Sequence, residues 1–417
     1  MCARWKNAAD AGSQSSPGKV PKRGDESRQR RRTLPEALLY PDGPAKDRTR
    51  DKENGKMSQK LRVGILGATG MVGQRFISLL ENHPWFEVVT VAASPRSAGK
   101  TYEEAVNGRW KMTTPMPEAV KKLIVMDLNE VEKVAATVDF VFSAVDMTKD
   151  EIRAIEEKYA KTETPVVSNN SAHRWTPDVP MVVPEINPEH FDVIEYQKKR
   201  LGTTRGFIAV KPNCSIQSYA PVLTAWKEFE PYEVVATTYQ AISGAGKTFK
   251  EWPEMEGNII PYIGGEEEKS EKEPLRIWGK IEDGVIVPAT EPKITCQCIR
   301  VPVLNGHTAA VFVKFRKKPT KEQLIEKLES FRGLPQELEL PSAPKQFIRY
   351  MQEDNRPQVT MDVDYENGMG ISVGRIREDS IYDFKFVGLS HNTVRGAAGG
   401  ALLCAETLKA KGYIQAK

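Results

Sequence analysis

The sequence predicts an α/β fold in two parts, a parallel sheet flanked by helices and a mixed α+β sheet. Between residues 61 and 169, short apolar runs alternate with amphipathic runs, as in strands joined by crossover helices. After residue 210 the strand-like runs are longer and alternate in polarity, which is typical of a mixed sheet. With 417 residues, 40% of them hydrophobic and 28% charged, the chain has globular composition and room for two or three domains.

Residues 1–57 are predicted to be a disordered extension, because this segment has little apolar periodicity. Residues 1–56 contain 14 Lys and Arg against 8 Asp and Glu, a net charge of +6, whereas the remainder has a net charge of −2. The run at 30–32 is interpreted as a solvated charge run, and the acidic residues argue against a transit peptide. Met57 is expected to be the functional start, since it directly precedes the first strand.

The composition also excludes several kinds of partner. The body has no basic excess, so no nucleic-acid partner is expected. No run of eighteen apolar residues predicts a membrane helix, so no membrane partner is expected. The five cysteines form neither a disulfide framework nor a paired zinc motif, which favours a reducing, cytoplasmic compartment and no metal. Cys296 and Cys298 share one strand face without further ligands, and we interpret them as core residues, like Cys404.

The first strand, residues 61–66, leads into a glycine-rich turn and a helix over residues 72–81. Strand, glycine turn and helix form the context required of a dinucleotide fingerprint. The spacing is G-x-x-G-x-x-G, a variant in which Gly67 and Gly70 allow a pyrophosphate to approach and Gly73 allows close packing. A tight turn without a ligand is the alternative. The predicted cofactor residues of this turn are Gly67, Thr69, Gly70, Met71, Val72 and Gly73.

The second strand, residues 87–93, indicates which dinucleotide binds. An NAD site usually has a carboxylate at the end of this strand to hold the ribose 2′-hydroxyl. Here Ser94, Arg96, Ser97 and Lys100 follow the strand instead. Hydroxyls and cations without a carboxylate favour a 2′-phosphate, so the sequence predicts NADP.

The remaining elements complete both parts. The parallel part continues with a strand over 138–145, a helix over 149–161 and a strand over 165–169. The mixed part is predicted to contain strands over 233–241, 296–303, 309–315 and 370–378, followed by a close-packed helix over 393–411.

One cysteine lies between a strand-like run, 207–210, and a helix-like run, 216–229, in the sequence Lys-Pro-Asn-Cys-Ser. A thiol at a helix start meets unpaired N–H groups and the positive end of the helix dipole, which stabilise the thiolate. Cys214 is therefore a candidate nucleophile for carbonyl carbon. A small buried hydrophobe is the alternative for a lone cysteine.

Seven segments, taken in order, resemble aspartate-β-semialdehyde dehydrogenases of the fungal and archaeal branch. They are GILGATGMVGQRF (64–76), SNNSAHRW (168–175), KPNCS (211–215), TTYQAISGAGK (237–247), GGEEEKSEKE (264–273), CIRVPVLNGH (298–307) and HNTVRGAAGG (391–400). The resemblance implies a Rossmann-type NADP-binding domain at 58–210 and an α+β mixed-sheet catalytic and dimerisation domain at 211–388. It further implies a C-terminal helix at 389–417 that packs back on the NADP-binding domain.

The resemblance also implies catalytic roles. Cys214 matches the nucleophile, and Asn213 matches the neighbour that shapes the acyl site. His307 matches the general acid and base, although a histidine taken alone is more often structural. Gln240 matches the residue that positions Cys214 or the acyl oxygen.

The substrate-binding residues follow from the same match. Arg300 would clamp the substrate carboxylate with its planar fork. Arg174 and Lys269 correspond to phosphate or carboxylate contacts, and Glu266 would orient the substrate ammonium or the basic cluster. An exposed acidic helix start is the alternative for 266–269.

Three further residues are predicted at the cofactor site, namely Ser243, Gly244 and Asn392. The loop 243–247 resembles a phosphate loop but lacks Walker spacing. The resemblance to the family implies that this loop closes over the site.

The implied activity is NADPH-dependent reduction of L-aspartyl-4-phosphate to L-aspartate-4-semialdehyde by a homodimer or homotetramer, a step in lysine, threonine, methionine and isoleucine biosynthesis. The alternatives are a malonyl-CoA or N-acetyl-glutamyl-phosphate reductase and a catalytically inactive NADP-binding scaffold.

Overall fold

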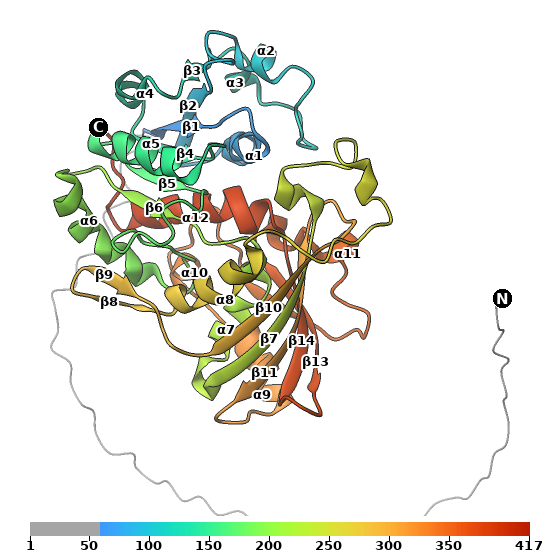
Figure 1. The fold of residues 1–417 in the computed structure, drawn as a ribbon. Coiled ribbons are helices and arrows are strands. Elements are labelled where there is room, and N and C mark those ends of the chain that lie inside the picture. The colour runs from blue at the N-terminus through green and yellow to red at the C-terminus, as the bar shows by residue number, and fades with distance from the viewer. Residues whose placement is uncertain (1–58) are drawn as a thin grey trace, which may run out of the picture. The chain divides into compact units, whose positions relative to one another are not determined.

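The computed structural model describes residues 59–417 (Figure 1). The predicted disordered extension over 1–57 and the predicted start at Met57 lie outside the described residues. Among the helices described, none is both long and apolar enough to cross a membrane.

The N-terminal part is a six-stranded sheet in which every neighbouring pair is parallel, in the order β3-β2-β1-β4-β5-β6. This is the doubly wound Rossmann order, which confirms the predicted fold class. The strands are β1 (Leu61–Leu66), β2 (Phe86–Ala93), β3 (Met126–Asp127), β4 (Phe140–Ser143), β5 (Val166–Ser168) and β6 (Ile208–Val210).

Helices cover both faces of the parallel sheet. Apolar residues of α1, α2 and the C-terminal α12 pack in one cluster with β1, β2 and β4, while α4 and α5 pack against the opposite side. In Figure 1 the red α12 runs along the lower side of the parallel sheet. The helices are α1 (Met71–Leu80), α2 (Tyr102–Val106), α3 (Glu118–Lys121), α4 (Val131–Thr137), α5 (Lys149–Lys161), α6 (Ile194–Leu201) and α12 (Gly399–Ala410). The predicted domain limits themselves stay predictions.

The second part is a mixed six-stranded sheet in the order β10-β7-β11-β14-β13-β12, in which only the two outer pairs are parallel. Residues of β11 alternate between buried and half-buried, so one sheet face lies in the core. The strands are β7 (Pro231–Gln240), β10 (Lys293–Arg300), β11 (His307–Phe315), β12 (Ile348–Met351), β13 (Ile371–Glu378) and β14 (Phe384–Ser390), with a separate hairpin of β8 (Lys280–Glu282) and β9 (Val285–Val287).

The remaining helices are distributed over both parts, and apolar residues of α7, α8 and α9 pack in one cluster with the mixed sheet. The α-helices are α7 (Ala220–Ala225), α8 (Glu266–Ile277), α9 (Lys321–Ser330), α10 (Leu334–Glu337) and α11 (Val359–Asp362). The 3₁₀ helices are η1 (Pro188–Val193), η2 (Ser215–Ser218), η3 (Lys227–Phe229), η4 (Ile242–Ala245), η5 (Pro253–Met255) and η6 (Tyr365–Gly368), and η7 (Val394–Ala398) is a π-helix.

Two predicted helices differ from the structure. The helix expected over 216–229 is divided into η2, α7 and η3, because Pro221 has no N–H with which to continue a helix from η2. The C-terminal helix begins with a π turn, in which the Gly396 N–H bonds to the His391 carbonyl at 2.9 Å. Such an insertion often marks a functional position. The predicted strands lie within a few residues of the observed ones, with β10 beginning and ending three residues before its predicted limits.

Gly388 allows η2 to lie against the mixed sheet. A Cβ atom built on Gly388 would lie 1.9 Å from the Ser218 carbonyl oxygen, at the end of η2. No side chain fits at this separation, so a glycine in β14 fixes how closely the turn after Cys214 approaches the sheet.

We predict that Gly388→Ala lowers the free energy of unfolding by about 3 kcal/mol, because the added methyl group must displace backbone. Urea unfolding midpoints would measure this loss. Gly264→Ala is the matched control, since the nearest atom to its added Cβ is 3.9 Å away. Equal midpoints for the two variants would contradict the packing argument.

Candidate active site

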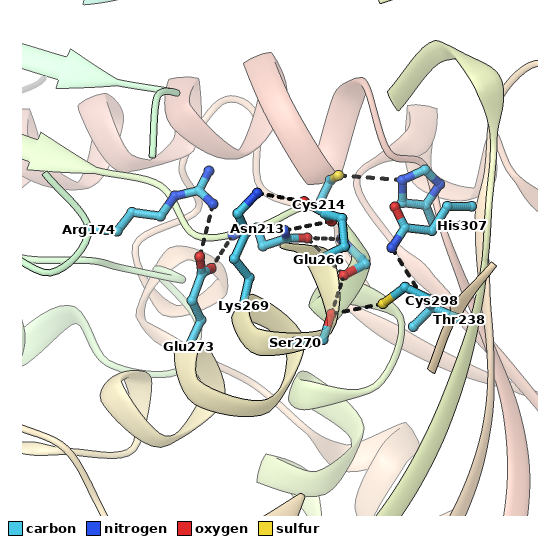
Figure 2. Close-up of polar contacts among 12 residues, drawn as sticks. Arg174, Asn213, Cys214, Thr238, Glu266, Lys269, Ser270, Glu273, Cys298 and His307 are labelled. Atoms are coloured by element: carbon cyan, nitrogen blue, oxygen red, sulfur yellow. Dashed lines mark hydrogen bonds and ion pairs between the residues drawn. The ribbon is translucent and has the colours of Figure 1, made fainter. Parts of the chain in front are cut away.

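Cys214 and His307 face one another across the junction of the two sheets (Figure 2). Cys214 follows β6 and caps η2, and its Sγ lies 3.4 Å from His307 Nε2. His307 begins β11, and its Nδ1 accepts the Ala241 N–H at 3.1 Å. Because Nδ1 is an acceptor, the neutral ring carries its proton on Nε2, directed at the sulfur.

Burial keeps both groups neutral. Burial raises the pKa of the Cys214 thiol, and the nearby Glu266 carboxylate raises it further. Burial, followed by the charge of Arg300, lowers the pKa of His307 to about 3. The expectation that a helix start lowers the thiol pKa is wrong in this structure. The physical reason is that Cys214 precedes a single 3₁₀ turn instead of a long helix, so little dipole opposes the loss of solvation.

Asn213 is held by four hydrogen bonds. Its N–H donates to Glu273 Oε2 at 2.6 Å, and its side-chain oxygen accepts the N–H and hydroxyl of Ser215 at 2.7 and 2.8 Å. This leaves Nδ2 to donate to Glu266 Oε2 at 2.9 Å. The residue before the nucleophile is therefore fixed, and it orients the Glu266 carboxylate.

One face of α8 supplies the acidic and basic groups of the site. Glu266, Lys269, Ser270 and Glu273 are spaced three or four residues apart, so they share a helix face. Lys269 Nζ pairs with Glu266 at 2.8 Å, and Ser270 Oγ lies 3.0 Å from the Ser215 hydroxyl. Figure 2 shows this face directed at the turn that carries Cys214.

The C-terminal ends of β7 and β10 bring Gln240 and Arg300 to the same edge. Their backbones pair directly, and both side chains are buried. Gln240 Nε2 donates to the Thr238 hydroxyl at 3.2 Å, and Arg300 Nη1 donates to the Ala241 carbonyl at 2.7 Å. Arg300 is thereby anchored by one nitrogen, while the rest of its fork is not engaged by a carboxylate within the described residues.

Arg174 reaches the site from the parallel-sheet part of the chain. Nη1 pairs with Glu273 at 3.0 Å, Nε donates to the Lys211 carbonyl at 3.0 Å, and Nη2 donates to the Asn169 carbonyl at 3.3 Å. The structure thus places Arg174, Lys269 and Glu266 around the turn that carries Cys214.

Ser243, Gly244 and Asn392 lie on the catalytic side of the site. Asn392 donates to the Ser243 hydroxyl at 2.8 Å and accepts the Gly306 N–H, which precedes His307, at 2.8 Å. A Cβ on Gly244 would lie 3.0 Å from Arg300 Nη1 and 3.2 Å from the His307 ring. Loop 243–247 therefore covers Arg300 and His307, and none of these three residues lines the cavity described next.

A cavity of about 580 Å³ lies at the carboxyl ends of β1, β2 and β4. Its lining includes Gly67, Thr69, Gly70, Ser94, Arg96 and Ser97 among the predicted cofactor residues, and also Lys100, Arg109 and Asp146. Met71, Val72 and Gly73 do not line it; they begin α1.

The backbone at this cavity fits a dinucleotide. A Cβ on Gly67 would lie 2.3 Å from the Ala144 carbonyl, and one on Gly73 would lie 2.3 Å from the Gly67 carbonyl, so both glycines are needed for close packing. At Gly70 the nearest atom would be 3.5 Å away, which leaves the start of α1 open to a phosphate. Arg96 and Lys100 follow β2, where an NAD site would usually have a carboxylate.

Two family models match the chain. One, described as "Semialdehyde dehydrogenase, NAD binding domain", matches residues 62–194, and the other, described as "Semialdehyde dehydrogenase, dimerisation domain", matches residues 221–395. A relative named aspartate-semialdehyde dehydrogenase from Methanothermobacter thermautotrophicus is 44% identical over 84% of this chain and 99% of its own length. The chain belongs to the aspartate-semialdehyde dehydrogenase family.

Fungal relatives and solved structures agree with this assignment to the family. The Saccharomyces cerevisiae enzyme of the same name is 42% identical, over 86% of this chain and all of its own. A Candida albicans aspartate-semialdehyde dehydrogenase solved with NADP matches with a TM-score of 0.77 at 40% identity, over 85% of this chain and all of that one. A Vibrio cholerae enzyme of the same family matches with a TM-score of 0.66 at 25% identity, over 85% of this chain and all of that one. The family's first domain binds a nicotinamide dinucleotide, and its second mediates dimerisation.

Several residues at this site were not predicted from the sequence. Glu273 was not selected, although its spacing of seven residues from Glu266 predicts a shared helix face. Arg109 lines the cavity but follows α2, where no pattern signals a ligand. Gly396 was also missed, and a Cβ there would lie 2.7 Å from the Cys214 Cβ.

We predict that iodoacetamide alkylates Cys214 at a rate that still rises with pH past the ordinary thiol pKa of about 8.5. Burial raises the pKa of this thiol, so the reactive thiolate accumulates only at high pH. A Cys2→Ser background removes the cysteine outside the described residues, and Cys296, Cys298 and Cys404 are buried. Cys214→Ser should remove the reaction, and a rate that is flat above pH 7 would contradict the prediction.

Proposed function

We propose that this chain reduces L-aspartyl-4-phosphate to L-aspartate-4-semialdehyde with NADPH, through a thioester on Cys214. The observation that carries the proposal is the 3.4 Å contact between Cys214 Sγ and His307 Nε2, beside Arg300 and the α8 charges. A nucleophile within hydrogen-bond reach of a group that can take up and give back a proton is the arrangement that acyl transfer uses. The relatives from M. thermautotrophicus and S. cerevisiae are both named after aspartate semialdehyde, the proposed product.

The substrate is proposed to bind between Arg300 and α8. The free part of the Arg300 fork would take the substrate carboxylate, because guanidinium matches carboxylate geometry. Glu266, already oriented by Asn213, would take the substrate ammonium. Lys269 and the free N–H groups of Arg174 would then face the phosphate, at the other end of the substrate.

The chemistry of the acyl step follows from the protonation states. The Cys214 thiolate attacks the acyl carbon, and the side chain of Gln240 is the proposed partner of the acyl oxygen. As the thiolate forms, the thiol proton passes to His307 Nε2, and the proton already on Nε2 goes to the departing phosphate oxygen; the ring therefore stays neutral and a thioester is left on Cys214. NADPH, when bound, supplies the hydride that reduces the acyl carbon. Cys214 then leaves as a thiolate and the semialdehyde is released.

The cofactor is proposed to be NADP, held by the turn 67–73 and by the cations after β2. The backbone N–H groups at the start of α1 would contact the pyrophosphate, and Ser94, Arg96 and Ser97 would contact the 2′-phosphate. Ser243, Gly244 and Asn392 are proposed to close the nicotinamide end, since they cover His307 and Arg300. We further propose a cytoplasmic homodimer or homotetramer formed through the second domain.

We predict phosphate-dependent reduction of NADP when the chain is given L-aspartate-4-semialdehyde, measured as NADPH absorbance in the reverse direction. Cys214→Ala should lower kcat at least a thousandfold with NADP binding unchanged, because the sulfur is the proposed nucleophile. Cys404→Ala, which removes a buried thiol from α12, is the control.

Other outcomes of this assay would reassign the chain. Reaction only with malonate semialdehyde and CoA would indicate a CoA-thioester reductase. Reaction only with N-acetyl-glutamate semialdehyde and phosphate would indicate an N-acetyl-glutamyl-phosphate reductase. NADP binding without turnover on any substrate would indicate an inactive scaffold.

We predict that Arg96→Ala raises the KM for NADP by about tenfold or more, the usual cost of losing a charge-assisted hydrogen bond, and leaves the KM for NAD unchanged. Initial rates with each dinucleotide would measure both constants. Lys133→Ala, which removes an exposed charge from α4, is the control. Equal increases in the KM for NAD and the KM for NADP would contradict the assignment of Arg96 to the 2′-phosphate site.

A further inference from the structure

We propose that Glu273 is a positioning residue that joins Arg174 to the nucleophile turn and lowers the affinity of the site for phosphate. This inference rests on the proposed function, because it concerns the phosphate that enters or leaves there. Glu273 belongs to α8 and is fully buried, at 0% exposure.

The two carboxylate oxygens of Glu273 serve different parts of the chain. Oε1 lies 3.0 Å from Arg174 Nη1, and Oε2 accepts the Asn213 N–H at 2.6 Å. Figure 2 shows Glu273 between these two groups, beneath the turn that carries Cys214. A single side chain therefore couples the arginine of the parallel-sheet part to the residue before the nucleophile.

Arg174 is fixed by this contact together with two others. Its donors to Glu273, to the Lys211 carbonyl and to the Asn169 carbonyl leave two of its five N–H groups unused. At 7% exposure the guanidinium has little freedom to turn. Any phosphate oxygen at Arg174 must therefore be met by the two remaining N–H groups, in the plane that Glu273 sets.

The carboxylate also changes the charge that a phosphate meets. The buried pair of Glu273 and Arg174 has no net charge, so an approaching phosphate is attracted by the arginine and repelled by the carboxylate. Loss of one partner from a buried pair leaves an uncompensated charge. In the absence of Glu273, a phosphate is the natural counterion of Arg174.

Attraction of phosphate by Arg174 together with repulsion by Glu273 suits a site in which phosphate is a leaving group. Tight binding of phosphate would delay its departure after the thioester forms, and it would not speed the chemical step. Glu273 thus keeps Arg174 in place for the transition state while it prevents the arginine from retaining the product.

Glu273→Gln tests this balance with little change in size. The amide oxygen can still accept one hydrogen bond, but the amide nitrogen must face the second donor, so one contact is lost. We expect the KM for phosphate to fall by about tenfold, because the substitution removes a unit negative charge that repels phosphate from within several ångströms. We expect kcat to fall by about tenfold as well, because the Asn213–Cys214 segment loses a fixed partner. A merely structural role would lower kcat or stability without lowering the KM for phosphate.

Three further variants isolate the charge. Glu268→Gln is the matched control, since Glu268 is exposed on the same helix and pairs with Lys272 at 2.7 Å. In the double variant Arg174→Met with Glu273→Gln, the gain in phosphate affinity should disappear, because the unpaired cation has been removed. Glu273→Asp keeps the charge, so it should lower kcat without lowering the KM for phosphate.

A second measurement does not need turnover. Inorganic phosphate should protect Cys214 from iodoacetamide at about tenfold lower concentration in Glu273→Gln than in the unaltered chain. Equal protection in both, or an unchanged KM for phosphate in an active Glu273→Gln variant, would overturn the inference. If the unaltered chain lacks phosphate-dependent activity, the proposed function fails separately, and the protection ratio still decides the role of Glu273.

Discussion

The position of the nucleophile depends on a buried ion pair between Arg395 and Glu185. The two ends of the Arg395 fork lie 2.7 and 2.5 Å from the Glu185 oxygens, and its Nε donates to Gln217 at 3.2 Å. Gln217 belongs to η2 and Arg395 to the π turn, so Arg395, fixed by Glu185, holds together two segments that are far apart in sequence. Breaking such a pair costs about 3–5 kcal/mol because a buried charge is left alone. With the turns held in this way, Gly396 lies directly against Cys214.

The site can form because strand direction brings distant residues to one edge. β7 and β10 are parallel, so Gln240 and Arg300 end side by side, whereas β11 is antiparallel to β7 and therefore begins at that same edge with His307. The carboxyl edge of the parallel sheet supplies Cys214 after β6. The dinucleotide cavity lies at the carboxyl ends of β1, β2 and β4, as the doubly wound topology requires.

Most charged groups of the site are already paired within the chain. Glu273 pairs with Arg174, and Glu266 pairs with Lys269, while the Cys214 thiol and the His307 ring are neutral. Burial also lowers the pKa of Lys211, next to Arg174, to about 7. Groups that are already paired or neutral lose little hydration free energy when a substrate excludes water from the site. Arg300 is then the cation most available to an acidic substrate.

The doubly wound sheet, the glycine turn and the family could be predicted from the sequence alone, because these depend on local periodicity and on side chains adjacent in the chain. The sequence also shows which residue types are available for catalysis. Three features become evident only in the folded chain: Cys214 precedes a broken helix, its thiol pKa is raised, and Glu273 and Gly396 contact its turn. The physical reason is that desolvation and long-range contacts depend on which segments pack together, and Glu273 and Cys214 are brought together only when α8 packs against η2.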